Sequence, residues 1–185
     1  MMRRLCITIL TASFISGCQV NTTHLQHDYE APSASLTADI ATYRDMQCPM
    51  TLFSYEDHRQ SKTMGSVAFT IVESDVDRWV ESALDHVNIS HEALASGGML
   101  KLTLAKAYIQ SLRGNMAANV VFGAQFKGPD DEDFSDKRYF RGHEVEVNFS
   151  STQGEIKTTL NKAIAKALAR IKAAYSESCA ADIPV

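Results

Sequence analysis

The densest polar cluster beside a predicted strand is Asp57-His58-Arg59, which follows Met50–Asp57. A carboxylate next to a histidine can orient the imidazole as a general base or as a ligand. The same residue types also form a tight turn, in which aspartate pairs with arginine and accepts from backbone N–H groups. We expect the turn. The alternative is a hydrolase or metal-dependent enzyme built around Asp57, His58 and His143.

Two other groups of side chains could bind a metal, and each has a simpler interpretation. His24 and His27 have chelating spacing, but a flexible pair without a third ligand binds weakly. The acidic run at residues 130–133 lacks the central glycine of a calcium loop and predicts a solvated hairpin tip. The sequence contains no nucleophile elbow, phosphate-binding loop or zinc-protease motif. We therefore expect no enzymatic activity and no cofactor or resident metal.

A row of basic residues, Lys162, Lys166 and Arg170, recurs every fourth position in the predicted C-terminal helix. It predicts either a solvated helix face or a docking stripe for an anionic partner. The apolar residues of this helix should bury against the sheet, so the row should point into solvent. No acid on the helix neutralises the row, and replacing all three residues with Gln should leave the melting temperature nearly unchanged.

Cys18 ends a stretch typical of an exported protein. Arg3 and Arg4 precede the uncharged run at residues 5–15. At about 1.5 Å per residue, this run is too short for a hydrocarbon core about 30 Å thick. Ile15-Ser16-Gly17-Cys18 resembles the lipobox of bacterial lipoproteins. The resemblance implies that residues 1–17 are a signal peptide, cleaved before Cys18, and that lipid is attached to the cysteine.

The residue after the cysteine is Gln19 rather than aspartate, which resembles the signal for an outer-membrane destination. Residues 18–47 would then form a lipidated, flexible tether, and residues 48–180 a single periplasmic domain. Loss of Arg3 and Arg4 changes the formal net charge from −4 to −6. An acidic chain of this kind is unsuited to nucleic acid.

Two cysteines, Cys48 and Cys179, remain after Cys6 leaves with the signal and Cys18 takes lipid. In an oxidising periplasm they predict one disulfide, which would join the two ends of the domain. By the chain-entropy argument, so long a loop contributes up to about 5 kcal/mol of stability.

Hydrophobic periodicity predicts the element order β-β-α-β-β-β-α. The helices are expected at residues 76–87 and 156–175, and the strands at 50–57, 66–72, 100–109, 118–126 and 143–149. Residues 74–77 and 152–155 resemble capping boxes. After Leu104 the apolar alternation shifts phase, which predicts a bulge or a strand buried on both faces.

These elements predict an α+β fold: a mostly antiparallel sheet with two helices packed on one face. In the last strand, Val145, Val147 and Phe149 alternate with Glu144 and Glu146, which face the other way. One polar and one apolar face are typical of a sheet covered on a single side.

The chain resembles the YajG family of bacterial outer-membrane lipoproteins over most of residues 50–175. The similarity is carried by Asp57-His58-Arg59 with Gly65, the glycine pair Gly97-Gly98, the strand reaching Tyr108, the Gly114-Asn115 turn, the Tyr139-Phe140-Arg141-Gly142 strand and the terminal helix. These are structural patterns, so the resemblance transfers no catalytic residue.

The combined interpretation is a non-enzymatic accessory protein of a Gram-negative envelope, anchored by lipid and facing the periplasm. It would bind an envelope protein or an anionic envelope polymer. The alternative is a module that handles lipid or lipopolysaccharide in a groove between sheet and helices. A spare apolar cavity there would favour the alternative, and a filled interface would count against it.

The lipobox generates the first testable prediction. Cys18→Ser should leave the protein without lipid, as a membrane-held precursor or in the soluble fraction, because the acylated sulfur is gone. Fractionation and mass spectrometry measure this. An unmodified Cys18 in the mature wild-type protein would contradict the prediction.

Overall fold

The computed structural model describes residues 21–25, 29–31, 50–91 and 97–179. The predicted signal peptide, Cys18, Cys48 and the side chain of Cys179 lie outside the described residues. Lipidation and the disulfide therefore stay predictions.

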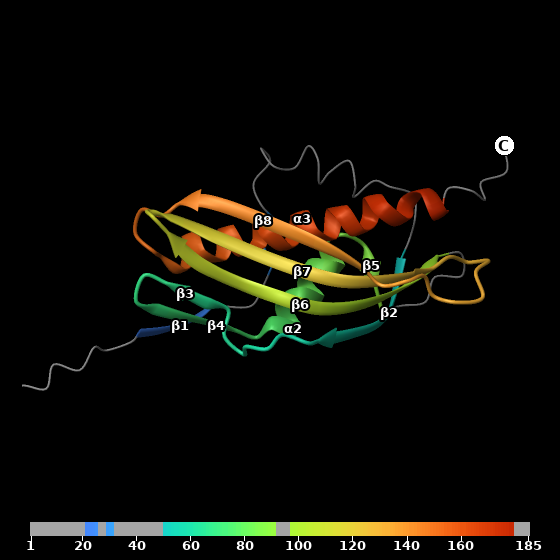
Figure 1. Cartoon of the computed structure of the whole chain (residues 1–185), viewed down its shortest axis with the longest axis horizontal. Coiled ribbons are helices and arrows are strands. Elements are labelled where there is room, and N and C mark those ends of the chain that lie inside the picture. Colours follow the sequence, from blue (N-terminus) through green and yellow to red (C-terminus); the bar gives the residue numbers. More distant parts are fainter. Residues whose placement is uncertain (1–20, 26–28, 32–49, 92–96, 180–185) are drawn as a thin grey trace, which may run out of the picture.

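The described residues form an α+β fold, as predicted, in which two helices lie on one face of a mixed sheet of eight strands (Figure 1). The helices are α2 (Val76–His86) and α3 (Gln153–Cys179). The strands are β1 (Asn21–Leu25), β2 (Met50–Asp57), β3 (Gly65–Val67), β4 (Thr70–Ser74), β5 (Ile89–Ser90), β6 (Gly98–Leu112), β7 (Asn115–Lys127) and β8 (Arg138–Val147).

The long strand β6 is the centre of the sheet. It pairs along one edge with antiparallel β7, which in turn pairs with antiparallel β8. Its other edge pairs with parallel β2 as far as Leu104 and with parallel β3 from Ile109. Most paired residues belong to antiparallel ladders, as the sequence predicts. The predicted bulge is confirmed, because the β6–β7 register shifts between Leu104 and Lys106.

The sequence prediction is wrong in two places on the β3–β4 side. The strand expected at 66–72 is two strands joined at Ala68-Phe69, where Ala68 has a positive φ of 53°. This turn has no glycine or proline to signal it, and Ser111 Oγ accepts from Ala68 N. In addition, residues 21–25, expected in the tether, form β1 in parallel pairing with β4.

The chain before residue 48 therefore contributes to the domain. Leu25 and Tyr29 are buried in the core, and Ser82 Oγ accepts from Tyr29 N at 3.2 Å. Burial raises the pKa of Tyr29 to about 12. Short β-branched runs suit an open sheet edge, and β1 covers the edge of β4.

Among the described residues, the interface between sheet and helices is closely packed. Phe122, Leu100, Leu102 and Leu104 pack from the sheet against α3 residues such as Ile164. Trp79 of α2 is a core residue, as expected, and its Nε1 donates to Asn161 Oδ1 at 2.8 Å. A cavity of only about 10 Å³ lies among Leu25, Trp79 and their neighbours, room for about one water. This counts against a lipid-handling groove between the layers.

Helix α3 begins at the predicted capping box, whereas the N-cap of α2 is Asp75, one residue after the expected Ser74. Asp75 accepts from Arg78 N at the start of α2. At the start of α3, Glu155 N donates to Thr152 Oγ1 and Thr152 N donates to Glu155, the reciprocal pair of a capping box. These bonds from Thr152, Phe149 and Ser150 lower the pKa of Glu155. In the described part of the chain, no helix is long and apolar enough to cross a membrane.

Helix α3 lies directly on β8. A Cβ placed on Gly142 would sit 1.7 Å from the backbone oxygen of Ala163 and 2.8 Å from Ala167 N. No side chain can occupy this position without moving strand and helix apart.

Gly142→Ala should therefore destabilise the domain by about 1–3 kcal/mol, the usual effect of overpacking. Gly154→Ala is the matched control. Its Cβ would meet nothing closer than 4.0 Å in the first turn of α3, where alanine favours helix. Urea unfolding midpoints measure both variants. Equal midpoints for Gly142→Ala and wild type would contradict the packing described here.

Candidate binding groove on the open face of the sheet

The predicted docking row on α3 does not form a free cationic face, which corrects the sequence expectation. Lys162 forms an ion pair with Glu146, and Lys166 forms one with Glu144. Arg170 is exposed, and its Nη1 donates to the backbone oxygen of Arg141 at 2.6 Å. The helix itself carries no acid beside the row, but β8 supplies the carboxylates. The helix sequence alone therefore gave the wrong expectation. Whether the row docks anything stays a prediction.

The same contacts correct the expected orientation of β8. Its helix-facing positions are Phe140, Gly142, Glu144 and Glu146, whereas Val145 and Val147 are exposed. The acids face α3 because its lysines lie opposite them. Replacing the lysines should therefore lower stability rather than leave it unchanged, although partly exposed pairs contribute at most about 1 kcal/mol each.

A groove of about 700 Å³ opens where the sheet is interrupted beside β6. Pairing with β2 ends at Leu104 and pairing with β3 begins at Ile109, so the stretch Ala105–Tyr108 lies between the two. The groove is lined by His58, Arg59, Gln60, Ser61, Thr63, Gly65, Thr103, Ala105, Lys106, Ala107, Tyr108, Lys137 and Tyr139. Its residues come from the β2–β3 loop, from β6 and from the start of β8.

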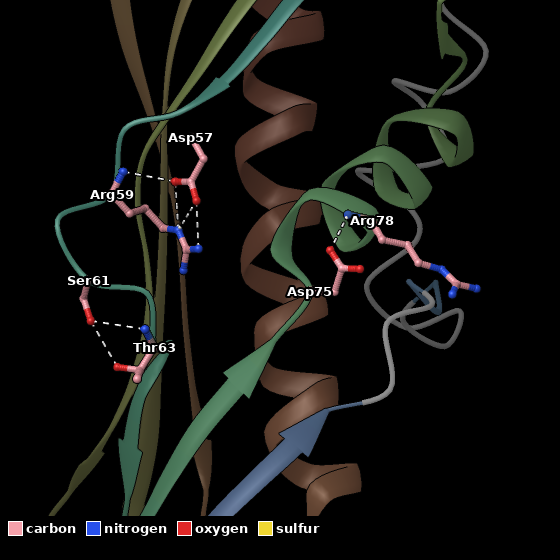
Figure 2. A network of polar contacts seen from close by, with 6 residues as sticks. All are labelled: Asp57, Arg59, Ser61, Thr63, Asp75 and Arg78. Carbon is pink, nitrogen blue, oxygen red and sulfur yellow. Dashed lines mark hydrogen bonds and ion pairs between the residues drawn. The ribbon is translucent and has the colours of Figure 1, made fainter.

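The β2–β3 loop forms one wall and is held by Asp57. Asp57 accepts from Arg59 N at 3.0 Å and from the Arg59 guanidinium, with Nη2 at 2.9 Å (Figure 2). Farther along, Thr63 N donates to Ser61 Oγ. The loop is joined to β6 at both ends, by His58 N donating to Leu104 O and Ile109 N donating to Met64 O. The predicted turn is thus the structure that Asp57-His58-Arg59 adopts.

The Asp57–Arg59 pair is mostly buried, with 16% and 6% of the side chains exposed. Burial acts to raise the pKa of Asp57, but hydrogen bonds and the charge of Arg59 outweigh it, so the pKa is lowered. Arg59 Nη1 is a buried donor with no hydrogen-bond partner among the described residues. The groove wall therefore keeps one unsatisfied guanidinium donor.

Lys137 and Tyr139 form the opposite wall by reaching across β7 at Gly123. A Cβ on Gly123 would lie 3.1 Å from Lys137 Cδ and 3.3 Å from Tyr139 Cε1. Lys137 Nζ then donates to Thr103 Oγ1 on β6 at 3.2 Å. The missing side chain at Gly123 lets both residues lie flat across the sheet.

The described groove lining carries the basic residues His58, Arg59, Lys106 and Lys137 and includes no aspartate or glutamate. Two of them have carboxylate partners, since His58 Nε2 lies 2.8 Å from Glu56 Oε2 and Arg59 pairs with Asp57. The described residues place no carboxylate at ion-pair distance from Lys106 or Lys137. The groove therefore offers two uncompensated cations, which attract an anion.

The structure does not bring together the residues of the enzymatic alternative. His58 contacts Glu56 rather than Asp57, and His143 Nδ1 lies 3.1 Å from Asn119 Oδ1 on β7, outside the groove lining. Within the described ranges, no three His, Cys, Asp or Glu side chains are grouped to hold a metal ion.

Sequence reasoning missed Lys106, Lys137, Tyr108 and Tyr139 as site residues. They lie on two separate segments, β6 and the start of β8, and none has diagnostic spacing. The one available signal is Gly123, a glycine inside an alternating apolar strand, which is typical of a close approach by other side chains.

No family model matches this chain, and no curated protein matches it. Solved structures with a related arrangement include a Xanthomonas campestris protein of family DUF330, with 9% identity, a TM-score of 0.48, and coverage of 86% of this chain and 96% of that one. A predicted lipoprotein from Caulobacter crescentus has 9% identity and a TM-score of 0.42, and the match covers 82% and 100% of the two chains. A minor lipoprotein from Acinetobacter baumannii has 11% identity and a TM-score of 0.36, with 68% and 93% covered. These likenesses assign neither a family nor a function to this chain.

The buried pair generates a pH-dependent prediction. The pKa of Asp57 is lower in the folded state, so its ionised form stabilises the protein above the unfolded pKa of about 3.9, and this contribution is lost as the pH falls through the folded pKa. Asp57→Asn should destabilise by about 1–3 kcal/mol at neutral pH, because buried Arg59 loses its counter-charge.

The difference between Asp57→Asn and wild type should shrink in acid, as urea midpoints across pH measure. Asp75→Asn, at the α2 cap, is the matched control, since asparagine caps a helix as well as aspartate does. A deficit for Asp57→Asn that is independent of pH would contradict the role given to its charge.

Proposed function

We propose that this protein is a non-enzymatic binding protein of a Gram-negative envelope, anchored by lipid at Cys18 and facing the periplasm from the outer membrane. Its ligand is an anionic saccharide, carrying phosphate or carboxylate groups, bound in the groove beside β6. The observation that carries the proposal is a groove of about 700 Å³ whose described lining includes Arg59, Lys106 and Lys137 and no aspartate or glutamate.

The preference for an anion rests on the contrast between two sets of lysines. Lys162 and Lys166 are compensated by β8 glutamates, so they add little field outside the protein. Lys106 is exposed in the groove, and among the described residues Lys137 hydrogen-bonds only to the neutral hydroxyl of Thr103. On an acidic protein, two such cations in one concave site favour an anionic ligand.

The preference for a saccharide rests on the remaining lining. Tyr108 and Tyr139 offer aromatic surface with a polar tip, which suits the C–H face and the hydroxyls of a sugar ring. Ser61, Thr63 and Thr103 supply hydroxyl groups. The volume lies within the range of about 300–1,000 Å³ typical of ligand sites.

Binding rather than cleavage is supported by the described groove lining, which includes no aspartate or glutamate. Glycoside hydrolysis generally uses two carboxyl groups flanking the scissile bond. Close packing among the described residues beneath the sheet argues against the lipid-handling alternative. Envelope location rests on the lipobox and on Gln19.

The groove generates a binding prediction. The variant Lys106→Gln/Lys137→Gln should lose at least about tenfold in affinity for an anionic oligosaccharide, because two charge-assisted contacts disappear. The probes are a phosphorylated lipopolysaccharide core oligosaccharide, a carboxylated muropeptide and neutral dextran, measured by calorimetry at low and high salt.

Wild type should bind one of the two anionic probes more tightly than dextran, and more weakly as salt rises. Lys162→Gln/Lys166→Gln is the matched control: it removes the same charge from α3 and should bind like wild type. Equal loss in both variants, or no binding of either anionic probe by wild type, would overturn the proposed ligand.

A further inference from the structure

One end of the molecule exposes large apolar side chains. Phe69 is 87% exposed, Leu112 46%, Val147 57% and Phe149 83%. These four residues, called here the apolar tip, belong to three segments: the β3–β4 turn, the end of β6, and the end of β8 with the residue just beyond it. Phenylalanines this exposed bury little surface within the domain, so packing of the domain gives little reason for them.

Hydrogen bonds and strand pairing bring these segments together. Ala68 N, next to Phe69, donates to Ser111 Oγ, next to Leu112. Leu112 pairs with Asn115, and Asn115 pairs with Val147. Asn148 N donates to Gly114 O at 3.0 Å, which holds Phe149 beside the β6–β7 turn. Figure 1 shows these turns at the same end of the sheet.

The chain enters the domain at this same end. Asn21, the first residue of β1, pairs with Thr70, the neighbour of Phe69 (Figure 1). Asn21 is three residues after Cys18, and three residues span at most about 10 Å. A lipid on Cys18 would therefore hold the apolar tip close to the bilayer surface.

We infer that the apolar tip inserts into the interface of the bilayer to which Cys18 is attached. The inference rests on the proposed lipid anchor. The three loops contain Arg113 as their one charged residue across 68–70, 111–115 and 147–152. Phenylalanine and aliphatic side chains with an adjacent arginine suit the boundary between acyl chains and lipid phosphates.

In this arrangement the domain contacts the bilayer directly, instead of being separated from it by a long flexible tether. Tyr108 precedes Leu112 on β6 by four residues, about 13 Å of strand. The groove would then lie just above the lipid headgroups, within reach of saccharides attached to the membrane.

Tryptophan placed at the tip tests the inference. The lipidated protein is reconstituted in phosphatidylethanolamine–phosphatidylglycerol vesicles, with and without brominated acyl chains. Phe69→Trp and Phe149→Trp should each show blue-shifted emission and quenching by the brominated lipid. Phe53→Trp is the matched control, because Phe53 is 59% exposed beside Lys101, at the opposite end of β6, and should not be quenched. Buried Trp79 gives a constant background that the wild-type protein measures.

The outcomes separate the anchor from the tip. An unmodified Cys18 by mass spectrometry overturns both the proposed anchor and the inference built on it. A lipidated Cys18 with quenching at neither Phe69→Trp nor Phe149→Trp, or with equal quenching at Phe53→Trp, overturns the tip alone. Because the substituted residues are exposed, melting temperatures should match wild type, so loss of the signal cannot come from unfolding.

Discussion

The close contact of Gly142 with the backbone of α3 fixes the arrangement on which the rest of this structure depends. With no side chain between them, β8 and α3 approach until Ala163 lies against the strand. At that separation, Glu144 and Glu146 meet Lys166 and Lys162. The charges of Lys162 and Lys166 are therefore compensated within the helix layer, whereas Lys106 and Lys137 lie on the opposite side of the domain.

The second constraint is the way two short strands share one edge of β6. Neither β2 nor β3 pairs with Ala105–Tyr108, and the bulge at this level shifts the side chains that follow. An ion pair with hydrogen bonds joins Asp57 to Arg59 and holds the loop between β2 and β3 in place as one wall of the groove. The groove thus results from the way the strands pair. Its chemistry comes from side chains such as Lys106 on β6 and Lys137, which reaches across β7.

Much of the fold could be predicted from local patterns, because β2, α2, the bulge and both caps depend on neighbours in sequence. What could not be predicted depends on distant partners. β1 forms because the edge of β4 is available, and no composition signal marks Asn21–Leu25. The expectation that Lys162 and Lys166 are unpaired was wrong for a similar reason. Two residues along a strand and four along a helix both span about 6–7 Å, so Glu144 and Glu146 match Lys166 and Lys162 in space. The groove could not be predicted because the residues that line it come from segments far apart in the sequence.

The central claim is that the open face of the sheet, rather than α3, is the surface that meets the ligand. Lysine footprinting tests it most directly, by acylating intact envelopes and the purified protein with the same reagent and reading each site by mass spectrometry. The account predicts that Lys106 and Lys137 react readily in the purified protein and are protected in envelopes, whereas Lys166 reacts equally in both. Equal reactivity of Lys106 and Lys137 in the two samples, with protection confined to Lys162 and Lys166, would contradict it.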